Sequence, residues 1–300
     1  MTQTVRALPR RLTQALTPAL LAVGALMAAT PVLASAPQDR DVARVVSLGG
    51  SCNSCELSGR NLTGASFTGA SFVNATFVGS DLRGVEMMGS NFTGADFSRA
   101  NLHGVEILGA NFTSANFEGA RAAGAEAVGA TFVRANLSRS DLSGAELHGV
   151  NFNAAQLTGA NLSGTELFGA TLANVRATGA NFSSAQITAS NLSNGDFSGA
   201  SFRDAELDSA RLTGGRFARA DFTDASLRRT DIRGADLSDA RGLTQSQINQ
   251  ACGDGSTRLP SRLTAQTCRG GSRIVRAAPA APIPPVPPVP PRRNLVVASD

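Results

Sequence analysis

Large apolar residues recur at every fifth position through the middle of the chain. Of the 37 positions ending in 2 or 7 from Leu57 to Leu237, 34 are Leu, Phe, Ile or Met. Fourteen of the 15 Phe residues lie on this frame, and Phe168 is the exception. The residue two places earlier is small, most often Ala, and positions ending in 4 or 9 are often Gly. The repeating unit is therefore Ala, then Asn, Asp or Glu, then Leu or Phe, then Ser or Thr, then Gly.

A period of five excludes an α-helix, because steps of five rotate the apolar residue by about 140° each and spread it over every face. In an extended piece, residues i and i−2 share a face, so Ala and Leu both point inward, and Gly eases the turn that follows. Four such sides close a square coil of about 20 residues, and coils stack about 4.8 Å apart. The pattern predicts an all-β solenoid rod of roughly 44 Å.

This repeat, for example Ala110-Asn111-Phe112-Thr113-Ser114, closely resembles the pentapeptide-repeat family over residues 56–241. The resemblance implies a right-handed quadrilateral β-helix, and 37 repeats at four to a coil give about nine coils. Ala122, Ala127 and Ala177 depart from the pattern, because each replaces the large central residue. Since Ala122 and Ala127 belong to consecutive repeats, we expect a thin core or a small void beside them.

Residues 1–34 have the features of a secretory signal peptide. A basic start that includes Arg10 and Arg11 precedes an apolar run over 18–29, and Ala34 or Ala36 completes a small-x-small cleavage pattern. We favour cleavage after Ala34, and both Sec and twin-arginine export remain open. The alternative is an uncleaved membrane anchor, but the apolar run is short for a membrane span. Export predicts a periplasmic or extracellular protein in an oxidising compartment.

Both ends of a stacked β-rod need caps, because unpaired backbone there invites edge pairing. We assign residues 35–55 to an N-terminal cap and 242–269 to a C-terminal cap with a short helix. Thr244 and Gln247 form a capping box that starts this helix, and Gly253 is a candidate for its stop. The Cys52-x-x-Cys55 opening and the segment Leu243–Cys268 are similar to the caps of exported bacterial pentapeptide-repeat proteins. Residues 270–300 are predicted to be a disordered, Pro-rich spacer.

Four cysteines allow three pairings. The predicted rod keeps the two ends tens of ångströms apart, whereas a disulfide needs Cα atoms within about 7 Å. We therefore expect Cys252–Cys268 and Cys52–Cys55 as the pairings within one chain. Redox and zinc roles for Cys52 and Cys55 are alternatives, but no thioredoxin-like pattern and no second ligand pair lie near them.

Every twentieth residue belongs to the same side of the predicted rod, and one side differs from the others. It combines an acidic row with an apolar row, both predicted to face outward: Glu86, Glu106, Glu126, Glu146 and Glu166, beside Met88, Leu108, Val128, His148 and Phe168. Exposed apolar patches usually mark contacts, so we predict a face for a protein partner or for self-association. Purposeless repeat duplication and cation binding along the Glu row are the alternatives.

Composition excludes most catalytic chemistry. All 27 basic residues are Arg, which removes lysine chemistry, and there are only two His residues. No nucleophile elbow, phosphate loop or metal-ligand spacing is present, and a smooth rod lacks the concavity that a catalytic site needs. We expect no enzyme activity, cofactor, metal or small-molecule substrate. Residues 56–240 hold 14 Arg and 19 acidic residues, and Tyr and Trp are absent, so we expect no nucleic acid partner either.

These observations predict a non-catalytic structural or protein-interaction rod of the cell envelope, with membrane contact only through an uncleaved signal. The alternative is a DNA-mimicking regulator of a topoisomerase, which resemblance to the gyrase-protecting branch of the family implies. The signal peptide and the lack of an inserted loop argue against this alternative.

Cleavage after Ala34 predicts a mature chain that begins at Ser35. The intact mass of the exported protein, measured by mass spectrometry, should match this start. A chain that begins at Pro37 would show that the second site is used, and a full-length chain in the cytoplasm would contradict export.

Overall fold

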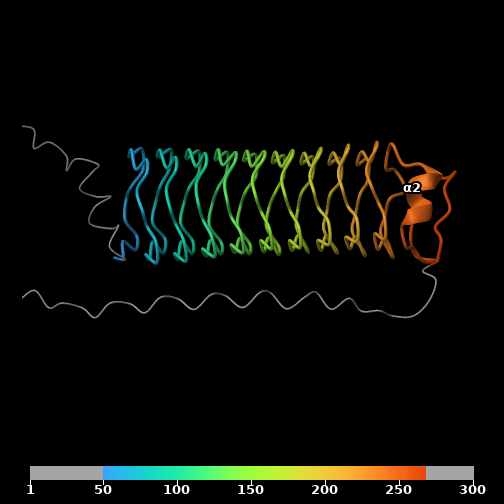
Figure 1. Cartoon of the computed structure of the whole chain (residues 1–300), viewed down its shortest axis with the longest axis horizontal. Helices are drawn as coiled ribbons and strands as arrows, with labels where there is room; N and C mark the ends of the chain where they lie inside the picture. The colour runs from blue at the N-terminus through green and yellow to red at the C-terminus, as the bar shows by residue number, and fades with distance from the viewer. Residues whose placement is uncertain (1–49, 268–300) are drawn as a thin grey trace, which may run out of the picture. The chain divides into compact units, whose positions relative to one another are not determined.

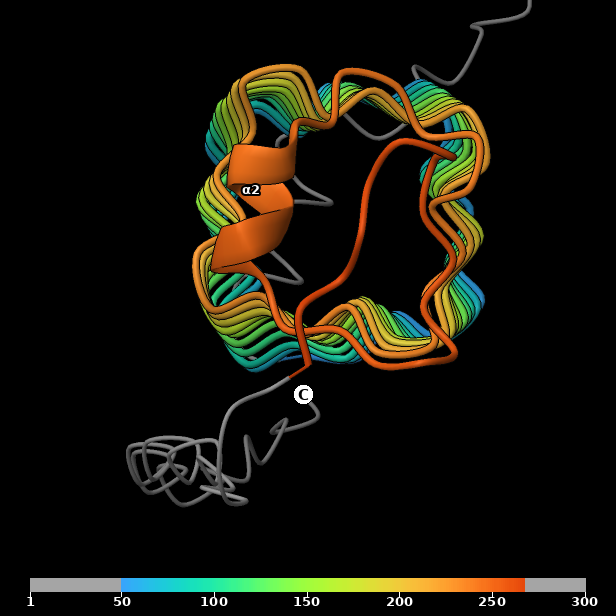
Figure 2. The same ribbon diagram turned by 90° about the vertical axis from the view of Figure 1, so that its right-hand side faces the viewer.

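The computed structural model describes residues 50–267. These residues wind into a stack of four-sided coils, which Figure 1 shows from the side and Figure 2 shows along the stack. The predicted signal peptide, most of the N-terminal cap including residues 42–48, Cys268 and the Pro-rich tail lie outside the described residues.

Successive coils are joined by parallel β-bridges between residues 20 positions apart. They run without interruption from Ser51–Ser71 to Asp221–Arg241. Within residues 50–267 each bridge involves a single residue on each side, so the extended pieces predicted from the sequence are shorter than expected. The reason is that two of every five residues belong to a turn, which leaves too little extended chain for a longer strand.

Almost every corner of a coil is a tight turn whose third residue has positive φ, and the turn at Asp239 is the exception. In one such turn, the Ala95 amide donates to the Phe92 carbonyl at 3.0 Å, and Gly94 has φ +69°. Gly adopts this conformation without steric cost, but sixteen non-glycine residues also adopt it, among them Arg134 and Ala154. The hydrogen bonds of the stack hold them there, since the Gly94 amide and its equivalents donate to the next coil, here to Thr113 O at 2.9 Å.

The polar residue before each large apolar residue supports the same turn. The Asn91 side-chain oxygen accepts from the Thr93 amide at 3.1 Å and from the Thr93 hydroxyl at 2.7 Å. Asp and Asn side chains form equivalent bonds two residues onward at many corners, which is the usual role of these residues in turns. The preference for Asn and Asp in the repeat therefore has a local cause.

The core consists of inward Ala, Leu and Phe side chains stacked in columns. Phe77 and Phe97 lie one coil apart with ring centroids 4.7 Å apart and planes within 1° of parallel. Phe92 meets Phe97 edge-on at 5.4 Å and 67°. Both arrangements are favourable for aromatic pairs. Where Ser replaces the small Ala, as at Ser80, the hydroxyl donates to a backbone carbonyl at 2.8 Å, so the buried polar group is satisfied.

A small void of about 20 Å³ lies in the core, and its lining includes Ala122 and Ala127. The sequence prediction of a small void near these two residues is confirmed. Phe112, Phe117 and Phe132 surround the space, and the lining is apolar apart from Ser140. The Ser140 hydroxyl already donates to Leu137 O at 2.8 Å. Because a water molecule needs two to four polar partners, we expect the void to be dry.

The helix α2, Gln245–Gln250, lies against the last coil (Figures 1 and 2). Thr244 is the N-cap of this helix, and the predicted capping box between Thr244 and Gln247 is present. Ile248 is fully buried, and Gln247 Nε2 donates to the carbonyls of Phe222 and Ala225 at 2.9 and 2.8 Å. The Ala225 carbonyl, which a further coil would otherwise satisfy, gains a donor in this way, whereas the Phe222 carbonyl also accepts from the Ala225 amide at 3.1 Å.

The prediction that Gly253 stops the helix is wrong. The helix ends earlier, with Ala251 as its C-cap. Gly253 instead forms a parallel bridge with Thr267, in the segment that crosses the end of the coil stack in Figure 2. A Cβ on Gly253 would come within 2.8 Å of Ala265 Cβ, so glycine is needed there for close packing.

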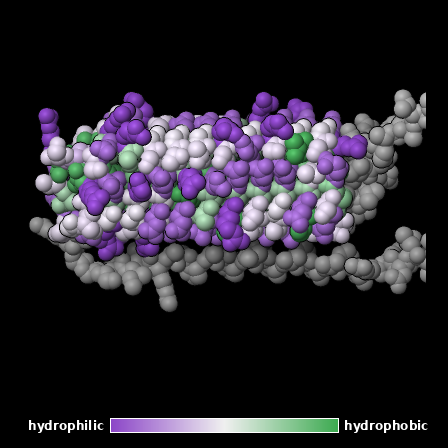
Figure 3. Space-filling view, turned by 180° about the vertical axis from the view of Figure 1, so that it is seen from behind, coloured by the Kyte–Doolittle hydropathy of each residue, from purple (hydrophilic) through white to green (hydrophobic). Residues whose placement is uncertain are grey.

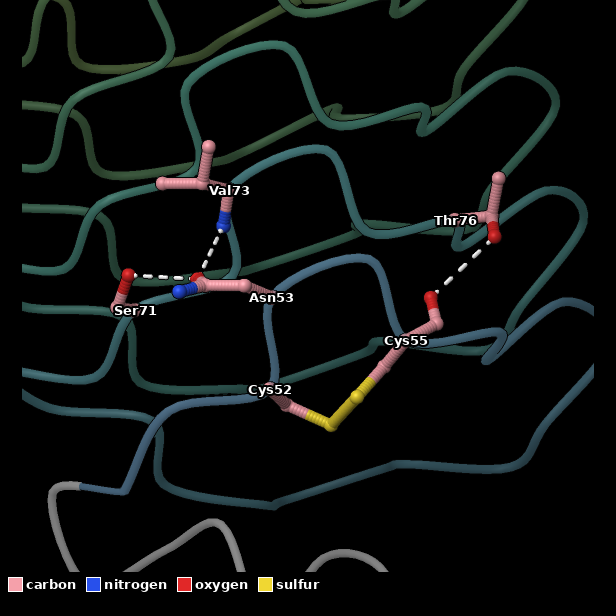
Figure 4. Close-up of a disulfide and its surroundings, with 6 residues drawn as sticks. All are labelled: Cys52, Asn53, Cys55, Ser71, Val73 and Thr76. Atoms are coloured by element: carbon pink, nitrogen blue, oxygen red, sulfur yellow. Dashed lines mark hydrogen bonds between the residues drawn. A yellow bond between two sulfur atoms is a disulfide. The ribbon is translucent and has the colours of Figure 1, made fainter.

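A disulfide joins Cys52 and Cys55 at the start of the stack, with Cα atoms 5.3 Å apart (Figure 4). The cysteines occupy the central and small positions of the repeat, and both pack against the core. Cys55 O accepts from the Thr76 amide at 2.8 Å and from its hydroxyl at 3.3 Å. The structure therefore contains the expected Cys52–Cys55 bond. Cys252 is also disulfide-bonded, but its predicted partner Cys268 lies outside the described residues, so that pairing stays a prediction.

Filling the void should stabilise the rod. Ala127→Leu restores the large residue of the repeat, and we expect a gain of about 0.5–2 kcal/mol in the free energy of unfolding, typical of cavity filling. Chemical denaturation measures the change. The control Ala177→Leu adds the same side chain at a fully buried position that does not line the void, so no gain is expected there. Equal shifts for both variants would contradict the role of the void.

Candidate interaction face

One side of the rod carries two parallel rows of unlike residues, which we call the mixed face. Parallel bridges place Glu86, Glu106, Glu126, Glu146 and Glu166 directly above one another. The outward residues two places later form the second row: Met88, Leu108, Val128, His148 and Phe168. Amides at the adjacent corner fix this register, since Gly89 N donates to Leu108 O and Gly149 N donates to Phe168 O, both at 2.9 Å. The structure thus brings all ten predicted residues to one side.

The apolar row is exposed. Met88, Leu108 and Val128 are 38, 37 and 40% accessible, and Phe168 is 57% accessible. Within residues 50–267 these four are the exposed large hydrophobic residues. Their alignment in one row is therefore a property of this side and not of the rod surface in general. Phe168 is also the single Phe outside the core frame of the repeat.

A row of glycines borders the apolar row on the side away from the acids. Gly89, Gly109, Gly129, Gly149 and Gly169 each have φ between +62° and +68°, and a Cβ built on any of them would meet nothing within 4 Å. No side chain therefore rises along this edge, and the apolar row is accessible from the side as well as from above. In the sequence, Gly at these positions indicated only a turn, so this second consequence was not predicted.

The acidic row is largely uncompensated. Within residues 50–267, the carboxylates of Glu86, Glu106, Glu126 and Glu146 form no hydrogen bond or ion pair, whereas Glu166 Oε2 lies 3.0 Å from His148 Nε2. No Arg occurs in the five stretches of chain that build the mixed face, such as 125–130. On the other sides, most acids cap turns or pair with Arg, as Asp81 does with Arg83 at 2.7 Å, and the exceptions within the described residues are Asp204, Asp224 and Asp239.

Hydrogen bonds within the fold lower the pKa of the acids that accept them. Asp81, which accepts from the Arg83 guanidinium, has its pKa lowered by that hydrogen bond. The pKa of Asp254 falls to about 2, chiefly because the Ser256 hydroxyl and then its amide donate to the carboxylate. Such acids are structural parts of turns. The free carboxylates of the mixed face have no comparable task within the fold.

The described residues on the other sides of the rod form no second candidate site. Figure 3 shows one long side of the rod, where hydrophilic residues run in rows along the axis. A shallow open depression beside Arg139 and Arg176 is lined by polar side chains, but Glu118 is bonded to Arg139 there. No group of three or more metal-ligating residues occurs among residues 50–267. In the same part of the chain, no helix has the length and apolarity of a membrane span.

The model of the family described as pentapeptide repeats matches in eight copies, which together cover residues 51–241. No curated protein matches. Among solved structures, the chain is similar to HetL of the cyanobacterium Nostoc sp. strain PCC 7120, a pentapeptide repeat protein involved in heterocyst differentiation regulation. The identity is 27%, with 63% of this chain and 83% of HetL covered, and the TM-score is 0.56. The fold is therefore a right-handed β-helix solenoid.

Two further similar structures have lower TM-scores. A pentapeptide repeat protein of the Arabidopsis thaliana thylakoid lumen is 28% identical over 36% of this chain and 71% of its own, with a TM-score of 0.27. QnrB1, a plasmid-mediated fluoroquinolone resistance protein, is 19% identical over 69% of this chain and 89% of its own, with a TM-score of 0.30.

Repulsion within the acidic row should be measurable. Glu126 lies between Glu106 and Glu146, and like charges directly opposite destabilise a sheet. We expect Glu126→Gln to stabilise the rod by a few tenths of a kcal/mol at low salt, and the gain should vanish near 1 M salt, where charges are screened beyond about 3 Å. Thermal unfolding of Glu206→Gln is the control, because Glu206 is an exposed acid of the same column whose neighbours one coil away are Gln186 and Ser226. A salt-independent gain would contradict the repulsion.

Proposed function

Because the chain belongs to the pentapeptide-repeat family, we propose that it is a non-catalytic, exported protein-interaction rod of the cell envelope that binds its partner through the mixed face. The observation that carries this proposal is the alignment of Met88, Leu108, Val128 and Phe168, the exposed large hydrophobic residues of the described part of the chain, in one row. A contiguous apolar patch with a polar rim is the usual signature of a contact surface.

The rest of the molecule supports a structural role. The stacked coils, about nine for 37 repeats at four to a coil, give a stiff scaffold on which the outer side chains vary without disturbing the core. In this proposal α2 and the segment after it act as the C-terminal cap, which prevents end-to-end pairing of rods. Free carboxylates add selectivity to the contact, because charge complementarity governs partner choice more than raw affinity.

Export is part of the proposal. It is supported by the signal-like segment 1–34 and by the Cys52–Cys55 disulfide, since disulfides persist in oxidising compartments. An exported protein would be separated from a cytoplasmic topoisomerase. Moreover, the unpaired Glu carboxylates form a single row beside exposed apolar residues, which does not favour the DNA-mimicking alternative.

Site-specific photo-cross-linking in the native host tests the proposal. A photoreactive residue at Leu108, on the mixed face, should give a discrete cross-linked product in the envelope fraction. The same residue at Val133, which has the equivalent outward position on another side, should not. With the photoreactive residue moved to position 128, replacing Met88, Leu108 and Phe168 by Ser should abolish the cross-link. The control variant Val73→Ser, Val78→Ser and Val133→Ser should preserve it. Equal cross-linking from positions 108 and 133 would refute the proposed face.

A further inference from the structure

The geometry of the mixed face indicates more than the existence of a partner. Resting on the proposed function, we propose that the partner presents an α-helix that lies along the rod axis, with an apolar stripe beside a row of basic side chains. The apolar stripe covers Met88, Leu108, Val128 and Phe168, and the basic row meets the Glu row.

The charge of the mixed face restricts the occupant. The mixed face contributes five carboxylates, of which four have no partner within residues 50–267, and no Arg occurs in the stretches that form it. A second copy of the same face would bring two acidic rows together without any cation between them. An acidic partner would be repelled in the same way. The occupant must therefore carry positive charge beside its apolar surface.

The spacing of the Glu row fits a helix better than a strand. Successive Glu residues are one coil apart, about 4.8 Å, so five of them span about 19 Å. An α-helix repeats its face every 5.4 Å, and four turns extend about 22 Å. The accumulated mismatch is about 2–3 Å, which long Lys or Arg side chains can accommodate. In a strand laid along the axis, same-face residues are about 6.7 Å apart, so four steps reach about 27 Å and the mismatch grows to about 8 Å.

The shape of the mixed face also leaves room for a helix. The glycine row beside the apolar row carries no side chains, and the space over each of these glycines is open. A cylinder about 10 Å wide can therefore settle on the apolar row and overhang the Gly edge, while its other flank meets the Glu row. His148 lies within the apolar row, between Val128 and Phe168, and holds Glu166. His148 consequently divides the apolar contact into a three-residue segment, Met88 to Val128, and Phe168 beyond it.

A designed peptide tests the inference directly. The probe is a peptide of about 18 residues, roughly 27 Å long as a helix, with Leu on one stripe and Lys on the neighbouring one. A control peptide of identical composition alternates Leu and Lys strictly, which favours a strand. Binding of each peptide to the purified full-length protein is measured by fluorescence polarisation at several salt concentrations, and circular dichroism reports whether the bound peptide is helical.

We expect the helical peptide to bind, to gain helix on binding and to weaken with added salt. The triple variant Glu106→Gln, Glu126→Gln and Glu146→Gln should lower its affinity by about tenfold, the combined effect of three exposed ion pairs. The matched control is Asp204→Asn, Asp224→Asn and Asp239→Asn, which removes three exposed acids from other sides. Because Asn tolerates the positive φ of Asp204 and Asp224, this control should keep the fold and leave the affinity unchanged.

The failures of the two proposals are distinguishable. Equal or tighter binding of the alternating peptide, or an unchanged affinity of the Glu→Gln variant, would overturn the helix inference. Absence of binding by both peptides, while Leu108 still cross-links in cells, would also overturn it and leave the proposed function intact. A concentration-dependent dimer in sedimentation experiments that the Met88, Leu108 and Phe168 to Ser variant abolishes would identify a second copy as the occupant instead.

Discussion

The backbone hydrogen bonds between successive coils are the constraint on which the rest of the structure depends. Each coil both donates to and accepts from the next in a fixed register of 20 residues, so a residue inserted or lost without a bulge would bring outward residues to inward positions in the later coils. The absence of Pro between Pro37 and Pro260 follows from the same requirement, because Pro has no amide hydrogen to donate. The Phe columns, the corner turns and the mixed face all inherit their register from these bonds.

The same register explains why core and surface are independent. Inward positions alternate with outward ones, so an outward change at residue 108 leaves the packing of Ile107 untouched. One side of the rod has therefore accumulated free carboxylates and exposed apolar residues, while neighbouring sides keep acids that serve their own turns, such as Asp221 with Thr223. Function in such a molecule is expressed by rows of equivalent positions and not by a cleft.

Much of the architecture could be predicted from the sequence, because period five leaves few alternatives for a chain that must bury its Leu and Phe residues. The void beside Ala122 and Ala127 was predictable for the same reason, since two large residues are missing in succession. The positive φ of Arg134 and Ala154 was not, because coil-to-coil bonds override local preference there. The pairing of Gly253 with Thr267 depends on a long-range contact, so helix-stop rules misassigned it. For the candidate site, the ten residues were predictable, but the lack of partners for the Glu row was not.

The aromatic columns in the core are not continuous along the rod. Ring contacts follow one another from Phe67 to Phe152 and resume from Phe182 to Phe222, with none between Phe152 and Phe182 in the described residues. A solenoid couples each coil mainly to its neighbours, so this aliphatic stretch is a seam between two blocks with stiffer cores. Because the backbone hydrogen bonds run through this stretch unchanged, the two aromatic blocks are held to each other by the backbone ladder and by aliphatic packing alone.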